Sequence, residues 1–117
     1  MKISANFTLS ELACRCGNCE PVVDKVFIER LQELRNAFAK PMTVTSWFRC
    51  KEYNAKIKGA TSSLHVLGRA VDIAMKNSAD RFDLVHLAIA FGFKGIGIYS
   101  GWIHIDNRDG TPHMWVG

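Results

Sequence analysis

One short segment near the end of the chain most constrains the fold. Trp102–Asp106 (WIHID) alternates two isoleucines with three residues that carry a polar group. Successive side chains of a β-strand point to opposite faces, so the isoleucines would face a core, with His104 and Asp106 directed together to the other side. Ser100-Gly101, between predicted strands over Lys94–Tyr99 and Trp102–Asn107, is a two-residue hairpin signal. The segment therefore predicts an antiparallel hairpin with one apolar and one polar face.

The rest of the chain mixes strands and helices. Apolar residues recur at spacings of four and three between Val23 and Phe38, which predicts a helix from about Val22 to Ala39. We expect shorter helices over Ser10–Cys14, Lys51–Ile57 and Ser78–Phe91, further strands over Met42–Ser46 and Arg69–Met75, and a loop over Ala60–Gly68. The predicted fold class is α+β, a small antiparallel sheet with helices packed mainly on one side.

Length and charge limit the function classes. A chain of 117 residues without a Pro/Gly/Ser-rich linker predicts a single domain, 1–117. The net charge of +4 is not gathered into a basic stripe, so we expect no nucleic-acid partner. The longest apolar stretch, Leu84–Phe93, is too short to insert into a membrane. Met1–Cys16 lacks a continuous apolar core, so we expect synthesis in the cytoplasm without a signal peptide.

Two histidines and an aspartate suggest a metal site. His65 lies in a loop that leads into the strand carrying Asp72, and Gly68 allows the turn between them. Together with His104 they would supply two nitrogens and one oxygen, and a catalytic zinc ion takes three protein ligands and keeps a fourth position for water. Spacing alone leaves a second interpretation open, in which they are ordinary loop and strand residues.

Two motifs resemble a known peptidase family. Ser63–Asp72 (SLHVLGRAVD) followed by Trp102–Asp106 resembles the signature of the zinc D-Ala-D-Ala carboxypeptidase and phage L-alanyl-D-glutamate peptidase family, whose fold is shared with the hedgehog signalling domain. Ser46–Asn54 (SWFRCKEYN) is similar to the family's Ser-Gly-Tyr-Arg segment, and Phe7–Cys14 to the start of many phage members. The resemblance covers about residues 6–107, in the family's order.

The resemblance implies a zinc metallopeptidase that hydrolyses peptidoglycan stem peptides. The bond would be L-Ala-D-Glu (endopeptidase) or D-Ala-D-Ala (carboxypeptidase), in cell-wall degradation of the phage endolysin type. His65, Asp72 and His104 match the Zn²⁺ ligands of the family, and Arg49 and Ser63 match substrate-binding positions. We expect a monomer that reaches the cell wall after release, by a holin-type route if the protein comes from a phage.

The chain departs from the family at one position. Many relatives carry Glu or Asp three residues before the second histidine ligand as the general base, but this chain has Gly101 there. Asp106 and His113 are the candidates for that role, although Asp106 could equally orient His104 or Arg49. The alternative function is a non-catalytic, zinc-containing module that binds the cell wall or another protein.

Four cysteines are not explained by the resemblance. Cys14, Cys16 and Cys19 lie close together and Cys50 lies far along the chain, next to Arg49. They could bind a structural zinc ion, form one or two disulfides, or remain free thiols. The spacing differs from the usual pair of C-x-x-C knuckles, so the sequence favours disulfides or free thiols over zinc. Cytosolic synthesis would delay disulfide formation until release.

Overall fold

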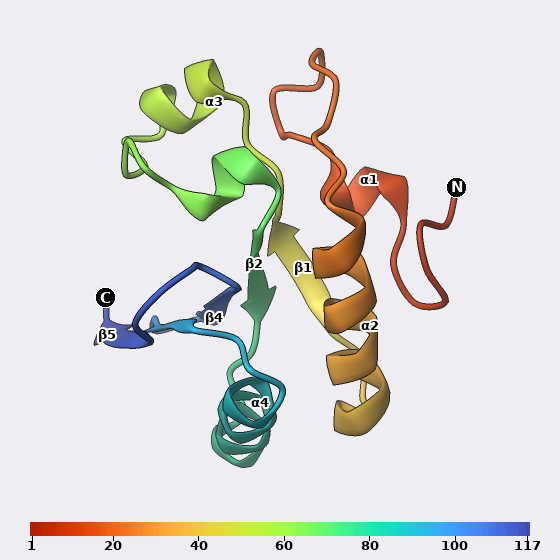
Figure 1. The fold of residues 1–117 in the computed structure, drawn as a ribbon, viewed down its shortest axis with the longest axis vertical. Helices are drawn as coiled ribbons and strands as arrows, with labels where there is room; N and C mark the ends of the chain where they lie inside the picture. Colours follow the sequence, from red (N-terminus) through yellow and green to blue (C-terminus); the bar gives the residue numbers. More distant parts are fainter.

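The computed structural model describes all of residues 1–117 and has an α+β fold, which confirms the predicted class (Figure 1). Five strands, four α-helices and one 3₁₀ turn follow one another along the chain. In order they are α1 (Leu9–Leu12), α2 (Lys25–Phe38), β1 (Thr43–Ser46), α3 (Lys51–Lys56), η1 (Leu64–Leu67), β2 (Ala70–Ala74), α4 (Ser78–Ala90), β3 (Gly95–Ile98), β4 (Trp102–Asp106) and β5 (His113–Val116). None of the helices has the length and hydrophobicity needed to cross a lipid bilayer.

The sheet is mixed, because one edge strand is parallel to its neighbour. Its strand order is β1-β2-β4-β3-β5, and every pair is antiparallel except β3 and β5. The predicted antiparallel arrangement is therefore wrong at this edge, where β5 runs parallel to β3. After β4 the chain crosses to the outer side of β3, so β5 runs opposite to β4 and hence in the direction of β3. The four residues of β5 show no clear alternation of apolar and polar side chains, and the sequence did not reveal this strand.

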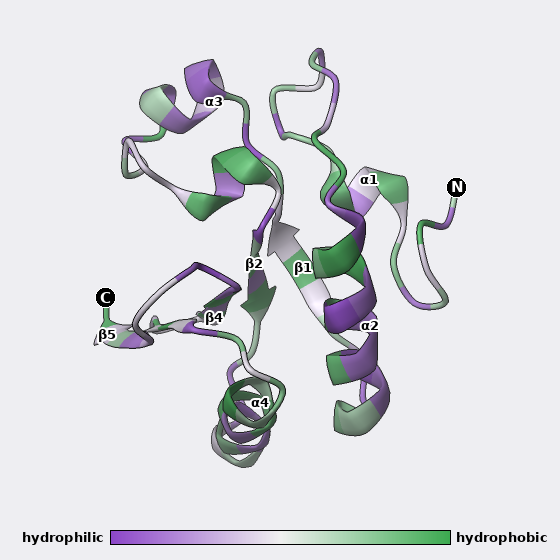
Figure 2. Cartoon of the chain, viewed as in Figure 1, coloured by the Kyte–Doolittle hydropathy of each residue, from purple (hydrophilic) through white to green (hydrophobic).

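One face of the sheet forms the hydrophobic core. Its buried residues are Val44 of β1, Val71 and Ile73 of β2, Ile103 and Ile105 of β4, and Ile96 of β3. Helices α2 and α4 supply the opposing apolar side chains, and Figure 2 shows hydrophobic and hydrophilic residues interspersed along α2, as expected for a helix with one buried face. The isoleucines of β4 thus face the core, as their alternation predicts.

Capping residues set where the helices begin. Thr8 and Glu11 form the capping box of α1, and Asn77 caps α4 by accepting from a backbone N–H. The Asp24 side chain caps α2 in the same way. The expected helix start at Val22 was therefore wrong, and Val23 lies before the helix with about half of its surface exposed (49%).

A short 3₁₀ turn replaces part of the expected loop between α3 and β2. η1 is capped by Ser63 and closes at Gly68, which has a left-handed φ of 70°. A Cβ atom on Gly68 would lie 2.7 Å from the backbone oxygen of Val22, so only glycine fits this close approach. The turn carries His65 over the polar face of the sheet.

Candidate metal centre

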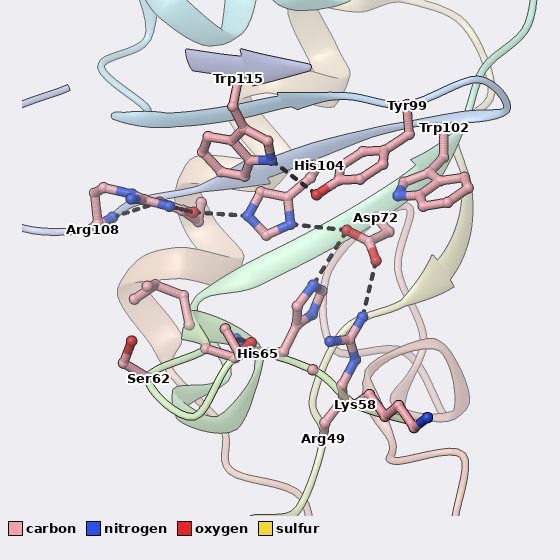
Figure 3. A pocket seen from close by; sticks show the side chains of 15 residues that line it. Arg49, Lys58, Ser62, His65, Asp72, Tyr99, Trp102, His104, Arg108 and Trp115 are labelled. Atoms are coloured by element: carbon pink, nitrogen blue, oxygen red, sulfur yellow. Dashed lines mark hydrogen bonds and ion pairs between the residues drawn. The ribbon is translucent and has the colours of Figure 1, made fainter. Parts of the chain in front are cut away.

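The register of the sheet brings the predicted ligands together. Asp72 lies on β2 directly opposite His104 on β4, and η1 places His65 above the same face (Figure 3). One ligand atom from each of the three side chains lies within 4.8 Å of the other two. All three residues are buried or nearly so. Their separation is that of groups that can share one metal ion.

The ring of His65 is fixed by the backbone. Its Nδ1 lies 2.6 Å from the carbonyl oxygen of Trp47. A carbonyl oxygen can only accept, so Nδ1 carries the proton and donates it. The other nitrogen, Nε2, then presents its lone pair toward Asp72 Oδ1, at 3.2 Å. Trp47 is itself completely buried in the core, so this orientation is held by a rigid part of the molecule.

The ring of His104 is fixed by a carboxylate. Its Nε2 lies 2.8 Å from Oδ2 of Asp106, which is fully buried and held by Nε and Nη2 of Arg108 at 2.9 and 2.7 Å. Burial alone would raise the pKa of Asp106, but the hydrogen bonds from Arg108 and His104 lower it below its ordinary value. Asp106 is therefore a carboxylate that accepts from Nε2–H, and Nδ1 of His104 is left facing Asp72 Oδ1 at 2.9 Å.

These constraints point lone pairs at one place. Two imidazole nitrogens and one carboxylate oxygen face one another, and such acceptor atoms repel unless a cation or a proton lies among them. Burial opposes the charged form of His104, yet hydrogen bonds with Asp106 and Asp72 raise its pKa above the ordinary value. The space between the two histidines and Asp72 thus favours a positively charged group. Nitrogen and oxygen ligands in this number fit zinc with one open coordination position.

Arg49 borders this centre. Its Nη2 lies 3.2 Å from Oδ2 of Asp72, the oxygen that does not face the histidines. Ser46 Oγ accepts from Nε at 3.1 Å and Asn54 Oδ1 from Nη1 at 3.4 Å. The backbone N–H of Arg49 donates to the carbonyl of His65 at 3.1 Å. The guanidinium is therefore held in place beside the candidate ligands.

A cavity of about 480 Å³ opens over the centre. Tyr99 and Trp102 stack with ring centroids 4.6 Å apart, and Trp115 Nε1 donates to the Tyr99 hydroxyl at 2.9 Å. Among the side chains that line it are these three aromatic ones, three from Lys or Arg, and only two carboxylates. The full lining consists of Arg49, Lys58, Gly59, Ala60, Ser62, Ser63, Leu64, His65, Asp72, Tyr99, Trp102, His104, Asp106, Arg108 and Trp115.

Not every predicted site residue reaches this cavity. Ser63 does, but its hydroxyl accepts from the backbone N–H of His65 at 3.2 Å, so it helps to position that candidate ligand. His113 does not. It is exposed at the start of β5 and lines a separate cavity with Phe93 and Met114.

Two glycines and an arginine of the site were missed at the level of sequence. Gly95 and Gly97 of β3 lie opposite Asp106 and His104. A Cβ atom on Gly95 would overlap the Asp106 carboxylate, and one on Gly97 would lie 2.8 Å from the rings of Trp115 and Tyr99. The alternation of glycine and isoleucine over residues 95–98 was the available signal. No sequence pattern indicated that Arg108 would hold Asp106.

The family described as Peptidase M15 matches residues 5–106. The chain belongs to the Peptidase M15 family. This confirms the resemblance inferred from the sequence motifs, and the matched residues include the three candidate ligands His65, Asp72 and His104. M15 enzymes are zinc-dependent peptidases, in agreement with the nitrogen and oxygen ligands described above. No curated protein matches the chain.

Proposed function

We propose that this M15 member is a zinc metallopeptidase that hydrolyses peptidoglycan stem peptides, with the ion held by His65, Asp72 and His104. The observation that carries the proposal is the convergence of three lone-pair atoms within 4.8 Å of one another. Each histidine ring has its remote nitrogen bound to a fixed acceptor, so its near nitrogen is free for a metal.

The residues around the centre suit peptide hydrolysis. A zinc ion bound there would supply a Lewis acid that polarises a carbonyl group and lowers the pKa of water. Arg49 can pair with a substrate carboxylate or stabilise the negative charge that develops on the carbonyl oxygen. Oδ1 of Asp72 faces the histidines and Oδ2 accepts a hydrogen bond from Arg49. The Asp72 carboxylate therefore fixes the position of the guanidinium relative to the candidate ligands.

The lining of the cavity suits an anionic peptide. Arg49, Lys58 and Arg108 all border it, and Tyr99 and Trp102 form a stacked aromatic wall. Both candidate bonds, L-Ala-D-Glu and D-Ala-D-Ala, lie next to a free carboxylate, which Arg49 would pair with in either case. We propose cell-wall degradation of the endolysin type as the setting for this activity.

The contacts of the Asp106 carboxylate bear on whether this residue can act as the general base. It is the only lining carboxylate apart from Asp72, and its oxygens are taken up by Arg108 and His104. We therefore propose that Asp106 orients His104 and holds no catalytic proton. The same observation supports the alternative function, a wall-binding module that retains the metal, because no lining carboxylate is free to act as a base.

One experiment separates the enzyme from the binding module. The zinc-loaded protein is incubated with purified muropeptides and the released fragments are identified by mass spectrometry. Release of D-Ala, or cleavage between L-Ala and D-Glu, identifies the bond. Loss of release in His104→Ala, and with 1,10-phenanthroline until zinc is restored, supports the peptidase. Wall binding with bound zinc and no fragments at any pH would support the module.

A further inference from the structure

A second group of potential metal ligands lies outside the candidate centre. Cys14, Cys16 and Cys19 follow α1 in a loop, and Cys50 caps the start of α3. All four Sγ atoms lie within 4.8 Å of one another. The Cys16–Cys19 and Cys14–Cys50 pairs are 3.2 and 3.8 Å apart, and Cys50 and Cys16 are 3.9 Å apart. The fold therefore gathers every cysteine of the chain in one place.

The spacing of the sulfurs is that of ligands around one ion. A disulfide joins its sulfurs at about 2.05 Å, and all four thiols here are free. In a tetrahedral four-thiolate site with Zn–S bonds of about 2.3 Å, neighbouring sulfurs are about 3.8 Å apart. Two disulfides would draw two pairs together, whereas here each sulfur is close to the other three.

Backbone N–H groups around the cluster favour thiolates. The N–H of Cys50 donates to Sγ of Cys14, and that of Tyr53 to Sγ of Cys50, each at 3.4 Å. Thiolates held by N–H donors are the form of cysteine that binds metals.

We infer that Cys14, Cys16, Cys19 and Cys50 bind a structural zinc ion as a closed four-thiolate site. Four protein ligands leave no position for water, which distinguishes this site from a catalytic one. Binding displaces the thiol protons and oxidises nothing, so it needs no partner beyond the metal ion. The sequence favoured disulfides or free thiols, but its spacing could not show that Cys50 joins the N-terminal loop.

The site would brace the segment that carries Arg49. Cys50 directly follows Arg49, and the N–H of Phe48 donates to the carbonyl of Leu12 at 3.0 Å, just before Cys14. An ion shared by Cys14 and Cys50 would cross-link the two segments that this backbone hydrogen bond already joins. Arg49 would then be held from both sides, by the ion and by its contacts with Ser46 and Asp72.

Counting bound zinc tests the inference independently of the peptidase proposal. Protein loaded with zinc and freed of excess metal should hold about two ions per chain by elemental mass spectrometry. The His65→Ala/His104→Ala variant should hold about one, bound at the sulfurs, and Cys16→Ser/Cys19→Ser about one, bound at the histidine centre. Failure of the peptidase proposal would leave the sulfur-bound ion in place.

The histidine variant keeps the test decisive if the cysteine variant does not fold. Loaded with Co²⁺, it should show the intense near-ultraviolet sulfur-to-metal absorption of a four-thiolate site. After chelation and denaturation without a reductant, freshly isolated wild-type protein should react at all four thiols. A histidine variant that binds no metal, or a wild-type protein with fewer than four reactive thiols, would overturn the inference.

Discussion

Nε2 of His104 donates to Oδ2 of Asp106 over 2.8 Å, and the two residues lie on the same face of the same strand. This contact decides which nitrogen of the imidazole can bind a metal. Arg108 completes it, because its guanidinium holds the carboxylate ionised in a position from which solvent is excluded. A residue that looked from the sequence like a possible base thus acts, in our proposal, as a positioning residue for a metal ligand.

Replacing Asp106 with Asn should weaken zinc binding at the histidine centre by about 10- to 100-fold, because the amide can no longer enforce the Nε2–H form of His104. Chelator competition would measure the affinity, with Co²⁺ spectra resolving this centre from the sulfur cluster. Asp109→Asn is the matched control, since Asp109 is largely exposed and contacts only Arg69. Unchanged zinc affinity with complete loss of turnover would instead make Asp106 the general base.

The Asp106 carboxylate should also make the free energy of unfolding of the metal-free protein fall at acidic pH. Its folded-state pKa lies below the ordinary 3.8, so its stabilisation is fully present above pH 3.8 and is lost as the pH falls through the folded value. We expect wild type to exceed Asp106→Asn in free energy of unfolding at pH 5 to 7, with the difference shrinking as the pH falls below 3.8. Denaturant titrations at several pH values measure it, and a pH-independent difference would contradict the assignment.

Gly95→Ala should disturb the centre from the neighbouring strand. The new methyl group would overlap the Asp106 carboxylate, and we expect a loss of about 1–3 kcal/mol in unfolding free energy together with weaker zinc binding. Gly101→Ala is the control, because the nearest atom to its Cβ would be Lys76 Cε at 3.9 Å. It should change stability by less than about 0.5 kcal/mol. Equal effects of the two substitutions would mean that the space beside Asp106 is not limiting.

Arg49→Lys should separate charge from geometry. Lysine keeps the positive charge but cannot contact Ser46, Asn54 and Asp72 together through a planar group. We expect kcat on a cleavable muropeptide to fall about 10²- to 10³-fold, with the zinc content unchanged. Lys56→Ala, at an exposed position on α3, serves as the control. If Arg49→Lys retained full kcat, the fixed guanidinium would have no role in turnover.

Local patterns predicted the parts of the site that depend on local geometry. Alternation along residues 102–106 was enough to place His104 and Asp106 on one face, because strand pleating has a period of two. The α+β class followed in the same way from the periods of the separate segments. The family motifs then pointed to His65 and Asp72 as partners.

Long-range packing supplied what the sequence could not. The proton position on His65 depends on the carbonyl of Trp47, and the ionised state of Asp106 depends on Arg108. Neither contact has a periodic signature. β5 was missed because its pairing with β3 requires the chain to cross to the far edge of the sheet. The convergence of Cys50 with the N-terminal cysteines has the same origin, since it depends on contacts between distant segments.

The pairing of Asp72 with His104 links the candidate centre to the folding of the core. Because side chains alternate along a strand, a slip of one residue between β2 and β4 would turn the apolar side chains of one of the two strands away from α2 and α4, and it would separate Asp72 from His104. Burial of the hydrophobic face therefore requires the same strand register that places Asp72 opposite His104. A chain that has buried its isoleucines correctly has therefore already placed the two candidate metal ligands, Asp72 and His104, opposite each other.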